Sequence, residues 1–168
     1  MNMDTLPKPC LTIPFPILLI FFVVNIFLAG TATLGNTLIL TALPKVSSVH
    51  PPTKLLLRSL AVTDLCVGGV VQPLYSVAMM IISNASWLIV FQVGSSLAHI
   101  LFQVSFFTVT AISVDRVLAL LLGLRYKHTV TLKRVRAVII CSWLVSISNG
   151  FIYCFWNYKS AEIGRAHV

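Results

Sequence analysis

The sequence predicts an all-α membrane protein that crosses the bilayer with four helices. Of its 168 residues, 58% are hydrophobic and only 10% are charged, whereas soluble domains carry about 25% charged residues. The interval 9–44 has no charged residue and is far longer than the about 20 apolar residues that a spanning helix needs. Short polar links separate four apolar stretches, which predict transmembrane helices at 17–43, 55–82, 88–122 and 135–156.

The first two predicted helices follow an irregular N-terminal segment. Residues 1–16 contain Asp4, Lys8 and four prolines instead of the basic start of a cleavable signal peptide, so the first helix is expected to insert as its own signal. In the second helix, Gly68-Gly69 would permit close approach of a neighbouring helix, and Pro73 removes one backbone hydrogen bond. These residues predict a kink in the second helix.

The third and fourth predicted helices differ in length. The third is longer than the bilayer requires, which predicts tilt or a projection beyond the membrane. At 100° per residue, one inward-facing stripe along it is expected to hold Ala98, Phe102, Ser105, Val109, Ile112 and Arg116. In the fourth helix, Trp143 lies too deep for the interfacial aromatic belt, and a structural role in packing or lipid contact is expected for it.

The basic residues predict how the chain is oriented. Nine of the 12 basic residues flank two of the links: Lys45, Lys54, Arg58, Arg116, Arg125, Lys127, Lys133, Arg134 and Arg136. Because basic residues concentrate on the cytosolic side, the N-terminus is expected outside the cell. Asn84-Ala85-Ser86 is a candidate glycosylation sequon, and it falls on the side expected to be extracellular.

Three polar residues lie at a common depth on different predicted helices. Counting 1.5 Å per residue, Asn36, Asp64 and Ser105 fall about 11 to 17 Å from the cytosolic ends of their helices, near the bilayer midplane. Polar groups at this depth are costly unless they face protein or water. They predict either an interior network that holds a small cation or ordinary hydrogen bonding between helices.

Several short motifs occur in a fixed order along the chain. They are Gly35-Asn36 in the first helix, Leu60 to Asp64 in the second, Asp115-Arg116-Val117 at the end of the third and Trp143 in the fourth. Together they resemble the rhodopsin-like G-protein-coupled receptors over almost all of 17–156. The resemblance implies that these helices are the first part of a seven-transmembrane bundle.

That resemblance also implies roles for individual residues. Asp64 and Ser105 match the family's allosteric sodium site, and Asn36 matches a polar contact in the same network. Arg116 matches a switch residue that the adjacent acid, Asp115, holds in the inactive state and that meets a heterotrimeric G protein in the active state. The implied protein is a receptor at the plasma membrane that responds to an extracellular ligand.

Three positions depart from the family pattern. Val117 stands where the family usually has a tyrosine after the arginine. Phe91 stands where the family usually has the cysteine of its extracellular disulfide, so that disulfide is in doubt. Ala98 stands where receptors for biogenic amines have an aspartate, so an amine bound in that manner is not expected.

Other classes of protein fit the sequence less well. The net charge of +8 comes from residues clustered between apolar segments, so no nucleic-acid groove is expected. No nucleophile with a base, phosphate loop or metal-ligand cluster is evident, so no enzyme and no cofactor beyond sodium are expected. A transporter or channel fragment and a structural four-span protein stay open as alternatives.

The last segment, 162–168, is expected to be non-native, because codons for these residues resemble a sequencing-library adapter. The receptor domain, 17–161, would then be truncated. Alone, it is not expected to signal.

Overall fold

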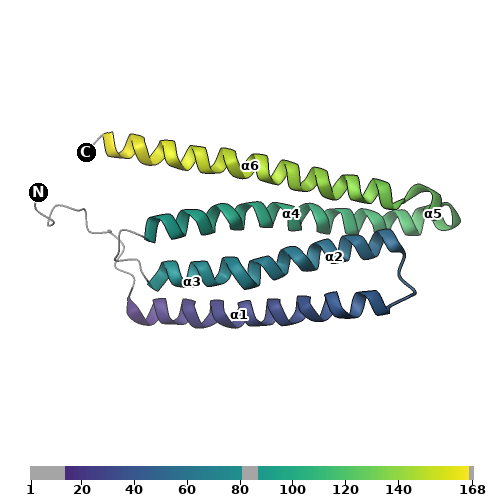
Figure 1. The fold of residues 1–168 in the computed structure, drawn as a ribbon, viewed down its shortest axis with the longest axis horizontal. Helices are drawn as coiled ribbons and strands as arrows, with labels where there is room; N and C mark the ends of the chain where they lie inside the picture. The colour runs from purple at the N-terminus through teal and green to yellow at the C-terminus, as the bar shows by residue number, and fades with distance from the viewer. Residues whose placement is uncertain (1–13, 81–86, 167–168) are drawn as a thin grey trace, which may run out of the picture.

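The computed structural model describes residues 14–80 and 87–166, in which every regular element is a helix (Figure 1). The long helices are α1 (Phe15–Ala42), α2 (Pro51–Cys66), α4 (Trp87–Leu122) and α6 (Leu132–Ala166). The shorter elements are η2 (Leu43–Lys45), η3 (Val67–Val71), α3 (Gln72–Met80), η4 (Gly123–Arg125) and α5 (Tyr126–Thr129).

Four spans in the described part of the chain are long and apolar enough to cross a membrane. They comprise Phe15–Lys45, Pro51–Ala78, Ile89–Leu122 and Leu132–Trp156. Large apolar side chains such as Phe21, Phe27 and Leu34 are exposed along α1, as expected where lipid replaces water around a helix. The predicted all-helical membrane fold is confirmed.

The helix boundaries differ most from the predicted ones in α2 and α6. α2 begins at Pro51, ahead of the predicted start at Leu55, because proline fits the first turn of a helix, where its missing N–H has no partner to lose. α6 begins at Leu132 and continues to Ala166, well beyond the predicted end at Trp156.

The second span is interrupted where its glycines and proline lie. η3 is a π-helical turn over Val67–Val71, and α3 follows it directly. Pro73 cannot donate a hydrogen bond, and its ring clashes with the carbonyl four residues earlier, at Gly69. A wider turn just before the proline relieves that clash.

Gly68 allows α1 and η3 to approach closely. A Cβ atom built on Gly68 would lie 2.9 Å from Thr33 Oγ1 and 3.1 Å from the Ala29 carbonyl oxygen. A Cβ atom on the adjacent Gly69 would meet nothing within 4 Å. Of the two glycines, Gly68 is therefore the one that the packing requires.

The helices lie side by side, with α4 between α6 and the α2–α3 span, and with α1 on the other side of that span (Figure 1). We call the end formed by 43–58 and 115–136 the basic end. A small core lies there, made by Leu56, Tyr126, Val130 and Val135.

Candidate functional site

The carboxylate of Asp115 is buried at the basic end and accepts two hydrogen bonds. Thr53 Oγ1 donates to Asp115 Oδ2 at 2.8 Å, and the hydroxyl of Tyr126 donates to Asp115 Oδ1 at 2.6 Å. The two hydroxyl oxygens are 3.2 Å apart. All three residues are buried, so hydroxyl donors replace the water that the carboxylate loses.

We call Thr53, Asp115 and Tyr126 the triad, and its three residues come from three different elements. Thr53 lies in the first turn of α2, next to the prolines that begin that helix. Asp115 lies in α4, and the chain reverses at Gly123, whose φ of 48° is in the left-handed region that favours glycine. After this turn, α5 places Tyr126 against both partners.

Tyr126 is held in its neutral form. Burial raises the pKa of its phenol above the ordinary value, and the hydrogen bond to Asp115 raises it further. The ring of His50 lies 5.2 Å from the Tyr126 ring, tilted by 57°. At neutral pH the phenol therefore stays a donor to the carboxylate.

Arg116 does not share these contacts. Its side chain is exposed, and in the described ranges it forms no ion pair or hydrogen bond with Asp115 or any other residue. The resemblance implies that Asp115 holds the adjacent arginine. In this structure the Asp115 carboxylate instead accepts hydrogen bonds from Thr53 and Tyr126. The arginine is left accessible at the basic end.

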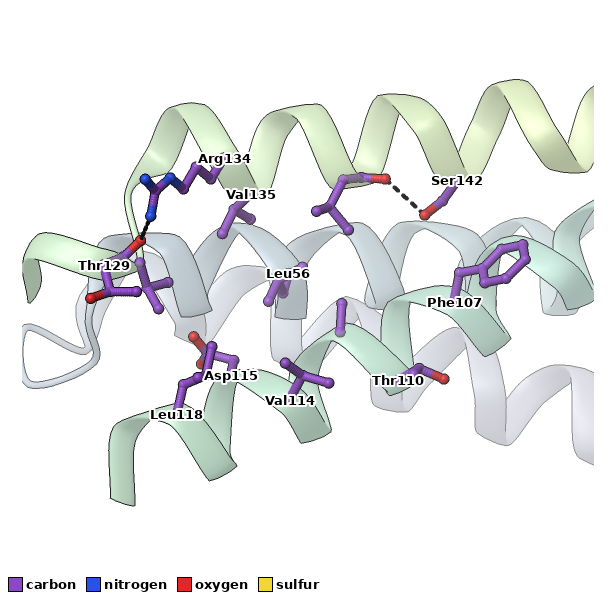
Figure 2. A pocket seen from close by; sticks show the side chains of 13 residues that line it. Leu56, Phe107, Thr110, Val114, Asp115, Leu118, Thr129, Arg134, Val135 and Ser142 are labelled. Carbon is purple, nitrogen blue, oxygen red and sulfur yellow. Dashed lines mark hydrogen bonds between the residues drawn. The ribbon is translucent and has the colours of Figure 1, made fainter. Parts of the chain in front are cut away.

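An apolar cavity of about 470 Å³ adjoins the triad between α4 and α6. Figure 2 shows Asp115 and Leu118 near one end of it, and Phe107 and Ser142 toward the other. At the Asp115 end, Arg134 donates to the carbonyl of Thr129 at 2.7 Å, which ties the start of α6 to α5.

The structure brings two of the three midplane residues together. Ser105 Oγ lies 3.2 Å from Asp64 Oδ1 and 3.0 Å from Thr63 Oγ1, and its single hydroxyl proton is shared between these two acceptors. The Thr63 hydroxyl itself donates to the Leu60 carbonyl at 2.8 Å, which leaves its lone pairs free for Ser105. The result is a cluster of hydroxyl and carboxylate oxygens between α2 and α4.

Asn36 takes a different partner. Its amide Nδ2 donates to the Ala32 carbonyl at 2.9 Å in its own helix, and within the described residues it has no hydrogen bond to Asp64 or Ser105. A Cβ on the neighbouring Gly35 would meet nothing within 4 Å. Trp143 is half-buried in α6, while Asn84 lies outside the described residues.

The stripe predicted to face inward along α4 is exposed at Phe102, Val109 and Arg116 and half-buried at Ala98, Ser105 and Ile112. Phe102 is 69% exposed and Val109 48% exposed. The fully buried side chains of α4 are Leu101, Val104, Thr108 and Asp115. Ser105 of this stripe meets Asp64 and Thr63 of α2, whereas Phe102 and Val109 are exposed, so the inward orientation of the whole stripe stays a prediction.

Thr53, Thr63 and Tyr126 were not among the predicted site residues. Thr53 and Tyr126 lie in or beside the polar links, where hydroxyl residues are common. Tyr126 is an aromatic residue between Arg125 and Lys127, and that placement of an apolar ring in a basic link is the signal that would have indicated a buried role.

The fold and these polar clusters define a helical multi-pass membrane protein with an acid–arginine pair at its basic end. The chain belongs to the rhodopsin family of seven-transmembrane receptors, because residues 35–165 match the family model described as "7 transmembrane receptor (rhodopsin family)".

Known relatives of the chain include adenosine receptors and a trace amine-associated receptor. The chain is 31% identical to adenosine receptor A2b of Rattus norvegicus over 83% of this chain and 42% of the relative. It is 31% identical to adenosine receptor A3 of Canis lupus familiaris over 88% of this chain and 47% of the relative. It is 30% identical to trace amine-associated receptor 1 of Macaca mulatta over 79% of this chain and 40% of the relative. The chain thus spans less than half the length of these relatives.

Proposed function

We propose that the whole protein is a ligand-activated receptor of the plasma membrane that signals to a heterotrimeric G protein. In this proposal the N-terminus is extracellular, and the basic end is cytosolic because basic residues concentrate on that side. The observation that carries the proposal is the engagement of Asp115 by Thr53 and Tyr126, which leaves Arg116 accessible.

The triad supplies a two-state element that a partner can bias. The hydrogen bonds from Thr53 and Tyr126 tie α4 to α2 and α5 at 2.8 and 2.6 Å. A ligand that shifts α4 relative to α2 would change these contacts, and a ligand shifts an equilibrium only by its differential affinity for the two states. Arg116, next to the triad, is then the group proposed to contact the G protein.

The exposed stripe of α4 supports a larger assembly around these four spans. Phe102 and Val109 are exposed on it, and the chain covers only 42% of the adenosine receptor A2b of Rattus norvegicus. We infer that the remaining helices of a seven-helix bundle pack against this stripe. The four spans alone would then lack much of the G-protein surface and would not signal.

The ligand is proposed to be a small molecule without an essential ammonium group. Ala98 presents a methyl group where the resemblance to amine receptors would require a carboxylate. Relatives named as adenosine receptors make adenosine the first probe, and trace amines the comparison.

We expect Arg116→Ala to abolish G-protein activation. The whole protein, reconstituted with a heterotrimeric G protein and given adenosine, is expected to accelerate guanine-nucleotide exchange. Arg116→Ala should remove most of this acceleration, whereas Arg125→Ala, which removes another exposed basic side chain, should preserve it. Full exchange with Arg116→Ala would refute the assigned role of Arg116. Exchange driven only by trace amines would refute the ligand assignment.

We also propose that Asp64 and Ser105 hold a sodium ion. The hydroxyl of Ser105 lies within hydrogen-bonding distance of both the Asp64 carboxylate and the Thr63 hydroxyl, and hard cations prefer such oxygen ligands. The bound ion would supply positive charge near the bilayer midplane. Asp64 supplies the compensating negative charge.

A sodium titration tests this site. Sodium at ten times its dissociation constant is expected to stabilise the chain by about 1.4 kcal/mol, which thermal unfolding in detergent would detect when sodium replaces N-methylglucamine. Asp64→Asn should remove the sodium-dependent increase. Ser95→Ala, which removes a hydroxyl bonded within its own helix, should retain it. A sodium response that survives Asp64→Asn would exclude the site.

A further inference from the structure

A second groove, of about 440 Å³, lies at the basic end between α1, α2 and α6. Three cations line it: Lys54 and Arg58 from α2, and Arg136 from α6. Its apolar wall includes Leu40, Leu43 and Leu132. The ends of α1 and α2 and the start of α6 lie together at this end of the bundle (Figure 1). Positive charge and apolar surface therefore meet in one groove.

The three cations have no anionic partner in the part of the chain that the structure describes. In these ranges the side chains of Lys54, Arg58 and Arg136 form no hydrogen bond or ion pair. Asp64 and Asp115, the two acidic residues of the four membrane-spanning segments, are engaged elsewhere. Asp115 accepts from Thr53 and Tyr126, and Asp64 accepts from Ser105. Three positive charges around one groove repel one another unless an anion lies between them.

The groove occupies the outer side of α2. At 100° per residue, Arg58 and Val62 lie about 120° and 160° around the helix from Asp64. Asp64 faces α4 through Ser105, and ionisable groups inside a membrane protein point toward its interior. The side of α2 with Arg58 and Val62 consequently faces the lipid.

We propose that this groove binds an anionic phospholipid of the cytosolic leaflet. The headgroup phosphates lie between Lys54, Arg58 and Arg136, and an acyl chain lies against Leu40, Leu43 and Leu132. Basic pockets between transmembrane helices on the cytosolic side suit such headgroups. The inference rests on the cytosolic placement proposed above for the basic end, but it does not depend on G-protein activation.

Lipid binding to the purified chain tests the proposal. The chain in neutral detergent is titrated with phosphatidylinositol bisphosphate, and bound lipid is counted by native mass spectrometry. Each basic residue near an anionic surface contributes enough that removing two of them, in Arg58→Gln/Arg136→Gln, should weaken binding by about thirtyfold. Phosphatidylcholine should bind far more weakly than phosphatidylinositol bisphosphate.

Matched variants distinguish binding in this groove from nonspecific attraction between positive charges and an anionic lipid. Lys127→Gln/Lys133→Gln removes two exposed positive charges that do not line the groove, and it should leave the affinity unchanged. Arg58→Lys/Arg136→Lys should retain most of the binding, and circular dichroism confirms the helical fold of every variant.

Three results would overturn the proposal. If Arg58→Gln/Arg136→Gln and Lys127→Gln/Lys133→Gln lose equal amounts of lipid affinity, the attraction is nonspecific. Binding of soluble inositol trisphosphate as tight as that of the lipid would mean that the headgroup binds without the apolar wall. Competition by cholesterol with no effect of Arg58→Gln/Arg136→Gln would assign the groove to a neutral lipid. Loss of G-protein activation with lipid binding intact would refute only the receptor proposal.

Discussion

Asp115→Ala is expected to lower the free energy of unfolding of the chain by about 3 kcal/mol, because hydrogen bonds to a charged acceptor contribute about 1.5–3 kcal/mol each. The substitution removes both bonds to the carboxylate and leaves two buried hydroxyls, 3.2 Å apart, that can still bond to each other. That remaining contact keeps the loss below the sum of two separate bonds.

Thr53→Val should cause about half of this loss, since Tyr126 still donates to Asp115 and one bond to a charged group is worth about 1.5 kcal/mol. Ser113→Ala provides the control, because the Ser113 hydroxyl is exposed and bonds only to the Val109 carbonyl of its own helix. Unfolding by sodium dodecyl sulfate in mixed micelles, followed by circular dichroism, measures all three. If Asp115→Ala is as stable as Ser113→Ala, the triad does not stabilise the basic end.

Gly68→Leu is expected to destabilise the chain by about 3 kcal/mol, at the upper end of the usual cost of overpacking. Its Cβ would meet the side chain of Thr33 at 2.9 Å and the backbone oxygen of Ala29 at 3.1 Å. The backbone oxygen belongs to α1, so relieving the second contact requires the two spans to separate.

Gly69→Leu is the matched control for this substitution. It introduces the same side chain in the same π-helical turn, where a Cβ has no neighbour within 4 Å. Thermal unfolding in detergent should show a large decrease for Gly68→Leu and little change for Gly69→Leu. Equal decreases would indicate that loss of glycine weakens the turn itself, and the close approach to α1 would not be the cause.

Hydropathy predicted the four spans because membrane crossing depends mainly on length and apolar composition. It predicted the start of the second helix poorly, since Pro51, Pro52 and Lys54 resemble a link when read as single residues. In the structure the prolines occupy the first turn of α2, and Lys54 lies one turn into the helix. Periodicity indicated which residues of α4 share a face, but it does not show what covers that face.

Part of the candidate site could likewise be predicted from the sequence, and part could not. Depth alone indicated that Asp64 and Ser105 meet, because charged and polar groups near the midplane must find partners in protein. The engagement of Asp115 by Thr53 and Tyr126 depends on residues 62 and 11 positions away in the chain. A contact of that kind requires the turn at Gly123 and the docking of α5, neither of which leaves a periodic pattern in the sequence.

The π-helical turn at η3 has a consequence for comparative numbering. A π turn closes its hydrogen bond one residue later than an α turn, so α3 is advanced by about one position relative to an uninterrupted helix. Tyr75 and Ser76 therefore stand over different neighbours than helical counting from Asp64 would assign. Positions that follow the turn in this span correspond to those of receptors without the turn only if they are counted from Pro73. A gap of one residue belongs in any such alignment between Val67 and Val71.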